Sequence, residues 1–323
     1  MARLVSLGSA LQDIYLIDRD DFGSFEYENR SMFKTLELGS KYDIDKLKYF
    51  VGGGGTNSAV TFARAGHEVI YLGNVANDPA GNAVFAKLDQ EGIDTSYISC
   101  PPRMKTGCSV ILLDSKSGER TVLTFRGASS KFDNLSPNDL DSLNPDWLYI
   151  TTLRGDMGTL LGFFDKAKRL GVKIMFNPGV LELANGKQLL TLLSYVDVLL
   201  LNKSEASQLV PGKTLEELLS NLKTYSKAII LTNGAEGGLA TDGEKTFSFG
   251  IYEDVKIKDT TGAGDAFGSG FLAAFAAKKS FKKSLVFASA NSTSVVQHLG
   301  AKDGILPLST ELHSMPIQEL KQG

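Results

Sequence analysis

The sequence predicts an α/β protein with a mostly parallel central sheet and helices on both of its sides. Short apolar, β-rich runs alternate with helical patterns along most of the 323 residues. Several runs are continuously apolar, such as residues 198–201 and 228–231. A run of this kind is typical of a strand whose two faces are both covered, as in a parallel sheet with helices above and below.

Six strands are expected along the chain, at residues 3–8, 68–73, 147–151, 172–177, 197–201 and 227–232. Six helices are expected between and after them, at residues 57–65, 79–91, 157–170, 215–225, 263–277 and 282–299. Two hairpins interrupt the alternation, one from residues 107–113 and 119–125 and one across residues 238–249. Residues 13–50 are polar and aromatic-rich, so together with residues 104–126 they are expected to form a small β-layer projecting from one undivided α/β body.

The charge balance excludes several classes of protein. The chain carries 34 Lys and Arg against 37 Asp and Glu, a net charge of −3, so it lacks the basic excess of a dedicated nucleic-acid binder. No apolar run approaches the roughly 20 residues that a transmembrane helix needs. Its two cysteines, Cys100 and Cys108, are too few for a disulfide framework, and the start does not resemble a signal peptide. We therefore expect reduced thiols, a cytoplasmic location, and neither a nucleic-acid nor a membrane partner.

Glycine is the compositional outlier, because 33 of the 323 residues, about 10%, are glycine, against an average share of about 7%. A first cluster, residues 52–55, precedes Thr56 and Asn57 at the start of a predicted helix. Glycines there allow the backbone to approach a ligand closely, and Asn57 offers both a donor and an acceptor. A flexible loop capped by Asn57 is the structural alternative.

The second cluster is Gly262-Ala263-Gly264, which leads into an apolar helix with Asp265 in its first turn. The free amides at such a helix start form a site for an anion. The structural alternative for Asp265 is a capping residue whose negative charge is favourable at the positive end of the helix dipole. An anion site flanked by a carboxylate nevertheless fits phosphoryl transfer, in which amides stabilise the moving group and the carboxylate accepts a proton.

Other chemistries lack their motifs. The chain contains no G-x-x-x-x-G-K-[ST] and no G-x-S-x-G, which excludes a P-loop enzyme and counts against an α/β-hydrolase. The turn after the first strand lacks the full G-x-G-x-x-G of a dinucleotide site. His67, His298 and His313 show no metal-ligand spacing.

Taken together, the two glycine clusters resemble the signatures of the ribokinase-like (PfkB-type) carbohydrate kinase family. The N-terminal signature resembles residues 52–57, and the C-terminal one resembles residues 259–267. Residues 202–205, 232–237 and 290–301 resemble three further family motifs. The resemblance covers essentially the whole chain and implies one kinase domain, residues 1–323, with a three-layer α/β/α sandwich and a β lid formed by residues of about 13–50 and 104–126.

The resemblance also implies a role for each matching residue. ATP and Mg²⁺ would be the cofactors, with Asp265 as general base and Gly262, Ala263 and Gly264 as the anion hole. The remaining assignments are the Mg²⁺–phosphate shell (Asn202, and Glu205 through water), the nucleotide pocket (Thr232, Gly234, Gly237, Asn291), the substrate hydroxyls (Asp13, Gly53, Gly54, Asn57) and a K⁺ site (Asp259, Thr261). Taken singly, Asn202 and Glu205 also fit a helix capping box.

The chain departs from ribokinases where they hold their sugar. Gly54 stands where ribokinases carry a lysine, Leu11 where they carry an asparagine, and residues 150–154 lack their glutamate. Ribose is therefore not implied, and Arg126 and Arg154, if they reach the substrate, would suit an acidic or phosphorylated sugar. Salt bridges on the surface or lid are the alternative for both.

Two other functions stay open. One is a nucleoside kinase of the same fold, with Phe22, Phe25, Tyr27 and Phe33 available to line a slot for a base. The other is a non-catalytic sugar or nucleotide sensor, which the intact Asp265 and anion-hole glycines disfavour. Exposed lid edges predict a homodimer in which two lids pair through their strands.

Overall fold

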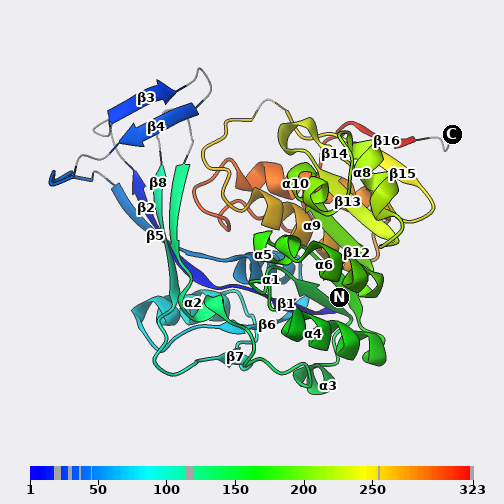
Figure 1. Ribbon diagram of the computed structural model, residues 1–323, viewed down its shortest axis with the longest axis horizontal. Coiled ribbons are helices and arrows are strands. Elements are labelled where there is room, and N and C mark those ends of the chain that lie inside the picture. Colours follow the sequence, from blue (N-terminus) through cyan, green and yellow to red (C-terminus); the bar gives the residue numbers. More distant parts are fainter. Residues whose placement is uncertain are drawn as a thin grey trace.

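A large twisted sheet forms the centre of the protein (Figure 1). The computed structural model describes residues 1–17, 23–27, 31–35, 38–44, 46–113, 120–253 and 255–320. Within these ranges the sheet has ten strands in the order β16-β15-β14-β13-β12-β11-β10-β1-β6-β7. Its parallel strands are β7 (Ile98–Ser99), β6 (Glu68–Asn74), β1 (Arg3–Leu7), β10 (Trp147–Ile150), β11 (Lys173–Phe176), β12 (Val198–Asn202) and β13 (Ala228–Thr232). Its antiparallel edge contains β14 (Gly238–Thr241), β15 (Thr246–Phe249) and β16 (Ile317–Leu320).

Helices cover both faces of this sheet. One face carries α3 (Asp139–Leu143), α4 (Met157–Leu170), α5 (Val180–Ala184), α6 (Gly186–Leu192), α7 (Lys203–Leu209) and α8 (Leu215–Leu222). The other carries α1 (Gly54–Arg64), α2 (Pro79–Gln90), α9 (Ala263–Ala276) and α10 (Phe281–Val295). The described residues also form three 3₁₀ helices: η1 (Gly127–Ser130), η2 (Leu193–Tyr195) and η3 (Gly234–Glu236). The predicted α/β class with a mostly parallel sheet is confirmed.

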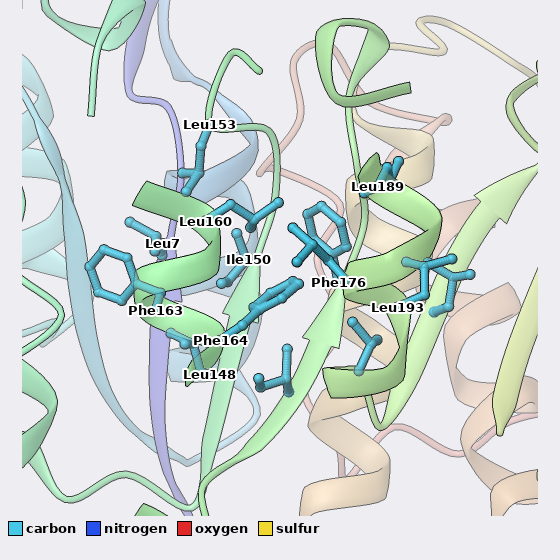
Figure 2. Close-up of a cluster of buried hydrophobic side chains, with 14 of the residues drawn as sticks. Leu7, Leu148, Ile150, Leu153, Leu160, Phe163, Phe164, Phe176, Leu189 and Leu193 are labelled. Atoms are coloured by element: carbon cyan, nitrogen blue, oxygen red, sulfur yellow. The ribbon is translucent and has the colours of Figure 1, made fainter. Parts of the chain in front are cut away.

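The strand β12 shows why its apolar run has no polar alternation. Leu199 and Leu201 belong to the hydrophobic cluster on the α4 side, while Val198 and Leu200 belong to the cluster on the α9 side. Because successive side chains point to opposite faces, a strand between two helical layers needs apolar residues at every position. Figure 2 shows the α4-side cluster, in which Phe164 packs edge-on against Phe176 with ring centroids 5.3 Å apart.

A second, four-stranded sheet stands beside the main body (Figure 1). Its order is β5-β2-β8-β9, and its strands are β2 (Leu11–Ile17), β5 (Lys46–Gly52), β8 (Gly107–Leu113) and β9 (Arg120–Phe125). A separate hairpin contains β3 (Gly23–Tyr27) and β4 (Ser31–Thr35). The face toward the main body carries Tyr15 and Ile111, which are buried in a small apolar cluster beside Phe50 and Leu299. This sheet occupies the segments in which the sequence predicted a projecting β-layer.

The main differences from the predicted elements lie at helix ends and in short elements. Helix α1 begins at Gly54, inside the glycine run, because Gly53 adopts φ 96° and its carbonyl accepts the Asn57 N–H at 2.9 Å. Helix α10 ends at Val295, four residues before its predicted end. Short elements such as α3, α5, α6, α7, β7 and β16 were not predicted, since they span at most seven residues and carry little periodicity.

The structure also bears on the two cysteines and on the possibility of a membrane-spanning helix. Cys100 and Cys108 are both free thiols. Within the described ranges, no helix combines the length and apolar character needed to cross a bilayer.

Candidate active site

The carboxyl edge of the parallel strands gathers the loops that carry the predicted site. Thr151 directly follows β10, while Asn202 and Thr232 end β12 and β13. Parallel strands all end at the same edge of a sheet, and this edge is where open α/β sheets bind ligands. The loop after β1 packs tightly there, since a Cβ on Gly8 would lie 2.0 Å from the Thr151 hydroxyl.

The two glycine clusters meet at this edge although about 200 residues separate them. The Asn57 side-chain amide donates to Asp265 Oδ2 at 2.7 Å. A Cβ on Gly54 would lie 3.3 Å from Asp265 Oδ1, so the glycine leaves that oxygen open. Gly53 must also be a glycine, because its φ is 96° and a Cβ would lie 2.4 Å from the Ser9 carbonyl oxygen. The first cluster therefore forms one wall beside the Asp265 carboxylate.

The second cluster provides the helix start that the sequence predicted. Gly262 adopts φ 79°, and a Cβ there would lie 2.3 Å from that of Ala301. The first bond of the α9 ladder runs from the Ala266 N–H to the Gly262 carbonyl oxygen at 2.8 Å. The N–H groups of Gly264 and Asp265 precede that bond, so they have no partner within the helix. They are available to an anion together with the positive end of the helix dipole.

Burial makes Asp265 a stronger base than an exposed aspartate. Loss of solvent raises its pKa above the usual range, while the Asn57 hydrogen bond and the positive charge of Lys302 oppose that rise. A raised pKa brings a carboxylate closer to that of an efficient general base near neutral pH. Oδ2 is held by Asn57, whereas Oδ1 faces the Gly54 backbone and stays free to accept a proton.

Lys302 is a site residue that sequence reasoning missed. Its side chain is 4% exposed, and its ammonium donates to Asn57 Oδ1 at 2.5 Å, to Thr56 Oγ1 at 3.0 Å and to the Val51 carbonyl at 2.6 Å. Burial lowers its pKa to about 7, against the attraction of Asp13 and Asp265. The ammonium fixes which end of the Asn57 amide faces Asp265, because only the oxygen accepts from it. Lys302 directly follows the 290–301 motif. From the sequence alone, a lysine at this position is interpreted as a surface residue.

The residues predicted for the nucleotide mostly line one pocket of about 120 Å³. Its walls include Thr232, Gly234 and Gly237 from the β13–β14 connection, and Ala263 and Gly264 from the start of α9. An anion held at the α9 amides and a group in this pocket would therefore be adjacent. Phe249 and Phe267, which stack with ring centroids 5.4 Å apart, add an apolar surface to it.

Asn291 is not among the residues that line that pocket, and its role in nucleotide binding stays a prediction. Its side chain is completely buried, where it donates to the Ala266 carbonyl at 2.8 Å and accepts the Leu306 N–H at 2.8 Å. It joins α9, α10 and the following loop. The pocket wall on α10 is formed instead by Ser289, Ser292 and Thr293.

Asn202 and Glu205 form the capping box that was the structural alternative for them. Asn202 Oδ1 accepts the Glu205 N–H at 2.9 Å, and Glu205 Oε2 accepts the Asn202 N–H at 2.8 Å. Burial raises the pKa of Glu205. The cap uses only Oε2, so Oε1 is left for a water molecule of a metal shell. The cap and the predicted Mg²⁺ role are therefore compatible.

Asp259 links the second sheet to the main body. It is fully buried, and its carboxylate accepts from the Tyr15 hydroxyl at 2.6 Å, the Gly300 N–H at 3.0 Å and the Thr261 N–H at 2.9 Å. Arg120 lies 3.8 Å from it. The Thr261 hydroxyl is buried without a hydrogen-bond partner among the described residues, and the K⁺ site at Asp259 and Thr261 stays a prediction.

Asp13 lies on the inner face of the second sheet, the face that is directed toward the site. It is 6% exposed, and its side chain covers Gly52, where a Cβ would lie 1.8 Å from Asp13 Oδ2. Burial raises its pKa, which Lys302 and a hydrogen bond with Ser109 lower in part. The structure thus places Asp13 beside the glycine run, and its role in substrate binding stays a prediction.

No group of three or more His, Cys, Asp and Glu in the described ranges is arranged to hold a metal ion.

Comparison with known proteins identifies the family of the chain. A family model described as pfkB family carbohydrate kinase matches residues 1–307. A ribokinase of Haemophilus influenzae is 29% identical over 264 residues, covering 79% of this chain and 83% of that protein. An ATP-dependent 6-phosphofructokinase of Thermoanaerobacterium thermosaccharolyticum is 26% identical over 280 residues, covering 83% and 85%.

The fold is shared with solved structures. That of Arabidopsis thaliana ribokinase complexed with ribose and ATP superposes with a TM-score of 0.77 at 24% identity, covering 95% of this chain and 96% of that one. The family match spans both glycine clusters and Asp265. The chain therefore belongs to the pfkB family of carbohydrate kinases.

Proposed function

We propose that this protein transfers the γ-phosphoryl group of ATP to a hydroxyl group of a sugar or sugar derivative. The observation that carries the proposal is the Asp265 carboxylate, with Oδ2 held by Asn57 and Oδ1 free, beside the unpaired amides at the start of α9. A base and an anion site side by side are what in-line phosphoryl transfer to a hydroxyl requires.

In this mechanism Asp265 accepts the proton as the substrate oxygen attacks the γ-phosphorus. The bond between that phosphorus and the bridging oxygen of ADP breaks, and its electron pair leaves with ADP. Of the predicted anion hole at residues 262–264, the Ala263 N–H donates to the Thr260 carbonyl at 3.3 Å. The free amides of Gly264 and Asp265 would therefore stabilise the charge on the phosphoryl oxygens. In this proposal Glu205, through Oε1, and Asn202 would hold the water shell of a Mg²⁺ ion, which would neutralise phosphate charge when bound.

The substrate side is formed by the second sheet and the glycine run. Asp13, Gly53, Gly54 and Asn57 lie around the same space, next to Asp265. We infer that the second sheet acts as a lid that excludes water from the γ-phosphate, since water would otherwise compete with the sugar. The Tyr15–Asp259 hydrogen bond would then be one of the contacts that hold the lid against the body.

An ADP-release assay over neutral sugars, sugar acids, sugar phosphates and nucleosides tests the proposal. We expect turnover with at least one sugar or sugar derivative. Turnover with nucleosides alone would establish the nucleoside kinase, whose candidate aromatic residues Phe22, Phe25, Tyr27 and Phe33 have side chains outside the described ones. No turnover with any compound would favour the non-catalytic sensor.

Pairing of two lids into a homodimer is supported by the apolar outer face of the second sheet. Leu123 and Phe125 on β9 are both 59% exposed, and Tyr49 and Leu47 on β5 are 60% and 51% exposed. The register places all four on the face opposite Asp13 and Tyr15. Exposed apolar side chains on a sheet with two edge strands favour burial against an equivalent sheet.

Light scattering at micromolar concentration is therefore expected to give twice the mass of one chain. L123K should shift the protein toward monomers, because it places a charge within the paired faces. L161K is the matched control, since Leu161 is 41% exposed on α4, away from the second sheet. A wild-type monomer would contradict the dimer. A cytoplasmic location also stays a prediction.

A further inference from the structure

Arg126 lies on the face of the second sheet that looks into the site. On that sheet Asp13 pairs with Ser109, and Ser109 pairs with Thr124, so these three side chains share the inner face. Arg126 follows Thr124 by two residues, directly after β9 ends, and is half-buried. The negative charge of Asp13 acts on its guanidinium, as expected for two groups on one face.

Arg154 approaches the same space from the main body. It lies in the loop after β10, three residues beyond Thr151, whose hydroxyl would lie 3.2 Å from a Cβ on Gly54. Arg154 adopts φ 62°, a left-handed conformation that few non-glycine residues adopt. Strain of this kind persists where the surroundings hold the residue in place, often at a functional site.

A buried carboxylate holds the loop in that conformation. Glu182 is completely buried, and its Oε1 accepts the N–H groups of Leu153 at 2.7 Å and Gly155 at 2.8 Å, on either side of Arg154. Its other oxygen accepts from the Thr152 hydroxyl at 2.8 Å, and that hydroxyl oxygen accepts the Arg154 N–H at 3.1 Å. The backbone that carries Arg154 is therefore fixed before any ligand binds.

The positive charges of Arg126 and Arg154 are not neutralised by an ion pair with a carboxylate of the described residues. Arg154 repels the charge of Arg126 and, together with burial as the larger cause, lowers the pKa of Arg126. Over the part of the chain that the structure describes, no carboxylate forms an ion pair with either arginine. Asp13, the acidic group on their side, is also shared with Lys302. Two half-buried arginines whose charges act on each other suit an anion, because their forked donors pair with carboxylate or phosphate oxygens.

We propose that Arg126 and Arg154 form a subsite for an anionic group, a carboxylate or a phosphate, on the sugar whose hydroxyl is phosphorylated. The inference rests on the proposed kinase function and names its substrate class as sugar acids or sugar phosphates. The anion lies on the lid side of the pocket, and the reacting hydroxyl lies at Asp265. The subsite acts in binding and orientation, so it contributes mainly to KM.

Steady-state kinetics of ADP release test the subsite with three groups of acceptors: neutral sugars, sugar acids and sugar phosphates. We expect an anionic sugar to have the highest kcat/KM. Preference for a sugar acid assigns a carboxylate to the subsite, and preference for a sugar phosphate assigns a phosphate. R126M and R154M should each raise the KM of that substrate at least about tenfold, the value of one lost charged hydrogen bond, with a smaller change in kcat.

Two controls separate the subsite from a structural effect. R126K and R154K keep the charge and should recover part of the lost affinity. R169M removes an arginine that is 70% exposed on α4, paired with Asp165, and should leave KM unchanged. A neutral sugar that outperforms every anionic one, with a KM insensitive to R126M and R154M, would overturn the subsite while the kinase function stands. Turnover of nucleosides alone, or of nothing, would overturn both.

Discussion

Replacing Asp265 with asparagine is expected to lower kcat by about 10²- to 10⁴-fold, the range that a positioned general base contributes. Asparagine has nearly the same shape and leaves the α9 amides in place, but it cannot accept the proton of the attacking hydroxyl. The nucleotide pocket is lined by other residues, so ATP should bind D265N as it binds the wild type. Calorimetric ATP binding and ADP-release kinetics measure the two properties separately.

The pH profile of the same variant gives a second readout. Only the ionised carboxylate acts as a base, and burial raises the pKa of Asp265. In the wild type, kcat/KM should therefore fall as the pH drops through a value above the usual range of an aspartate. D265N should lose this acid limb. D89N, which changes an exposed aspartate at the end of α2, is the control. Turnover of D265N close to that of the wild type would overturn the general-base assignment.

Replacing Lys302 with methionine is expected to lower kcat about tenfold to a hundredfold. The loss corresponds to one charged hydrogen bond that holds the base in place through Asn57. Without the ammonium, Asn57 Oδ1 loses its donor and the amide no longer has a fixed orientation toward Asp265. Lys302 touches neither substrate nor phosphate in this account, so it is a positioning residue.

The diagnostic readout for Lys302 is the acid limb of the kcat/KM profile. The charges that act on Lys302 are Asp13 and Asp265, which attract it, and Lys87 and Arg64, which repel it. Its positive charge lowers the pKa of Asp265, so K302M should move the acid limb to higher pH. K302R keeps the charge and should leave the limb near its wild-type position. K245M, which removes an exposed lysine paired with Glu319, is the control. An unmoved limb in folded K302M would contradict the coupling.

The sequence predicted the sheet well because burial on both faces leaves a local trace. Each parallel strand reads as an apolar run, whatever its neighbours are, and β12 is the clearest case. The long helices follow from their period, and α4 matches its predicted bounds. The glycine clusters were also visible, since Gly53 and Gly262 combine a left-handed φ with contacts so close that a Cβ would clash.

Contacts between distant segments leave no such trace. Asn291 reads as a pocket residue from its motif, but its place depends on the Ala266 carbonyl and the Leu306 N–H, which only the packing of α9 and α10 brings to it. The sequence motif suggests Asp259 as a cation ligand. Its hydrogen bond with the Tyr15 hydroxyl could not be predicted, because it forms only when β2 packs against the main body.

The amino-acid sequence alone therefore determined the α/β class, the two glycine clusters and Asp265 as the candidate base. The tertiary structure decided which groups surround that base. Lys302 lies 37 residues after Asp265 in the chain and 245 after Asn57, yet it joins both in one hydrogen-bonded line. The physical reason is that patterns of burial and backbone conformation are local properties, whereas desolvation and charge pairing depend on segments that become neighbours only when the chain folds.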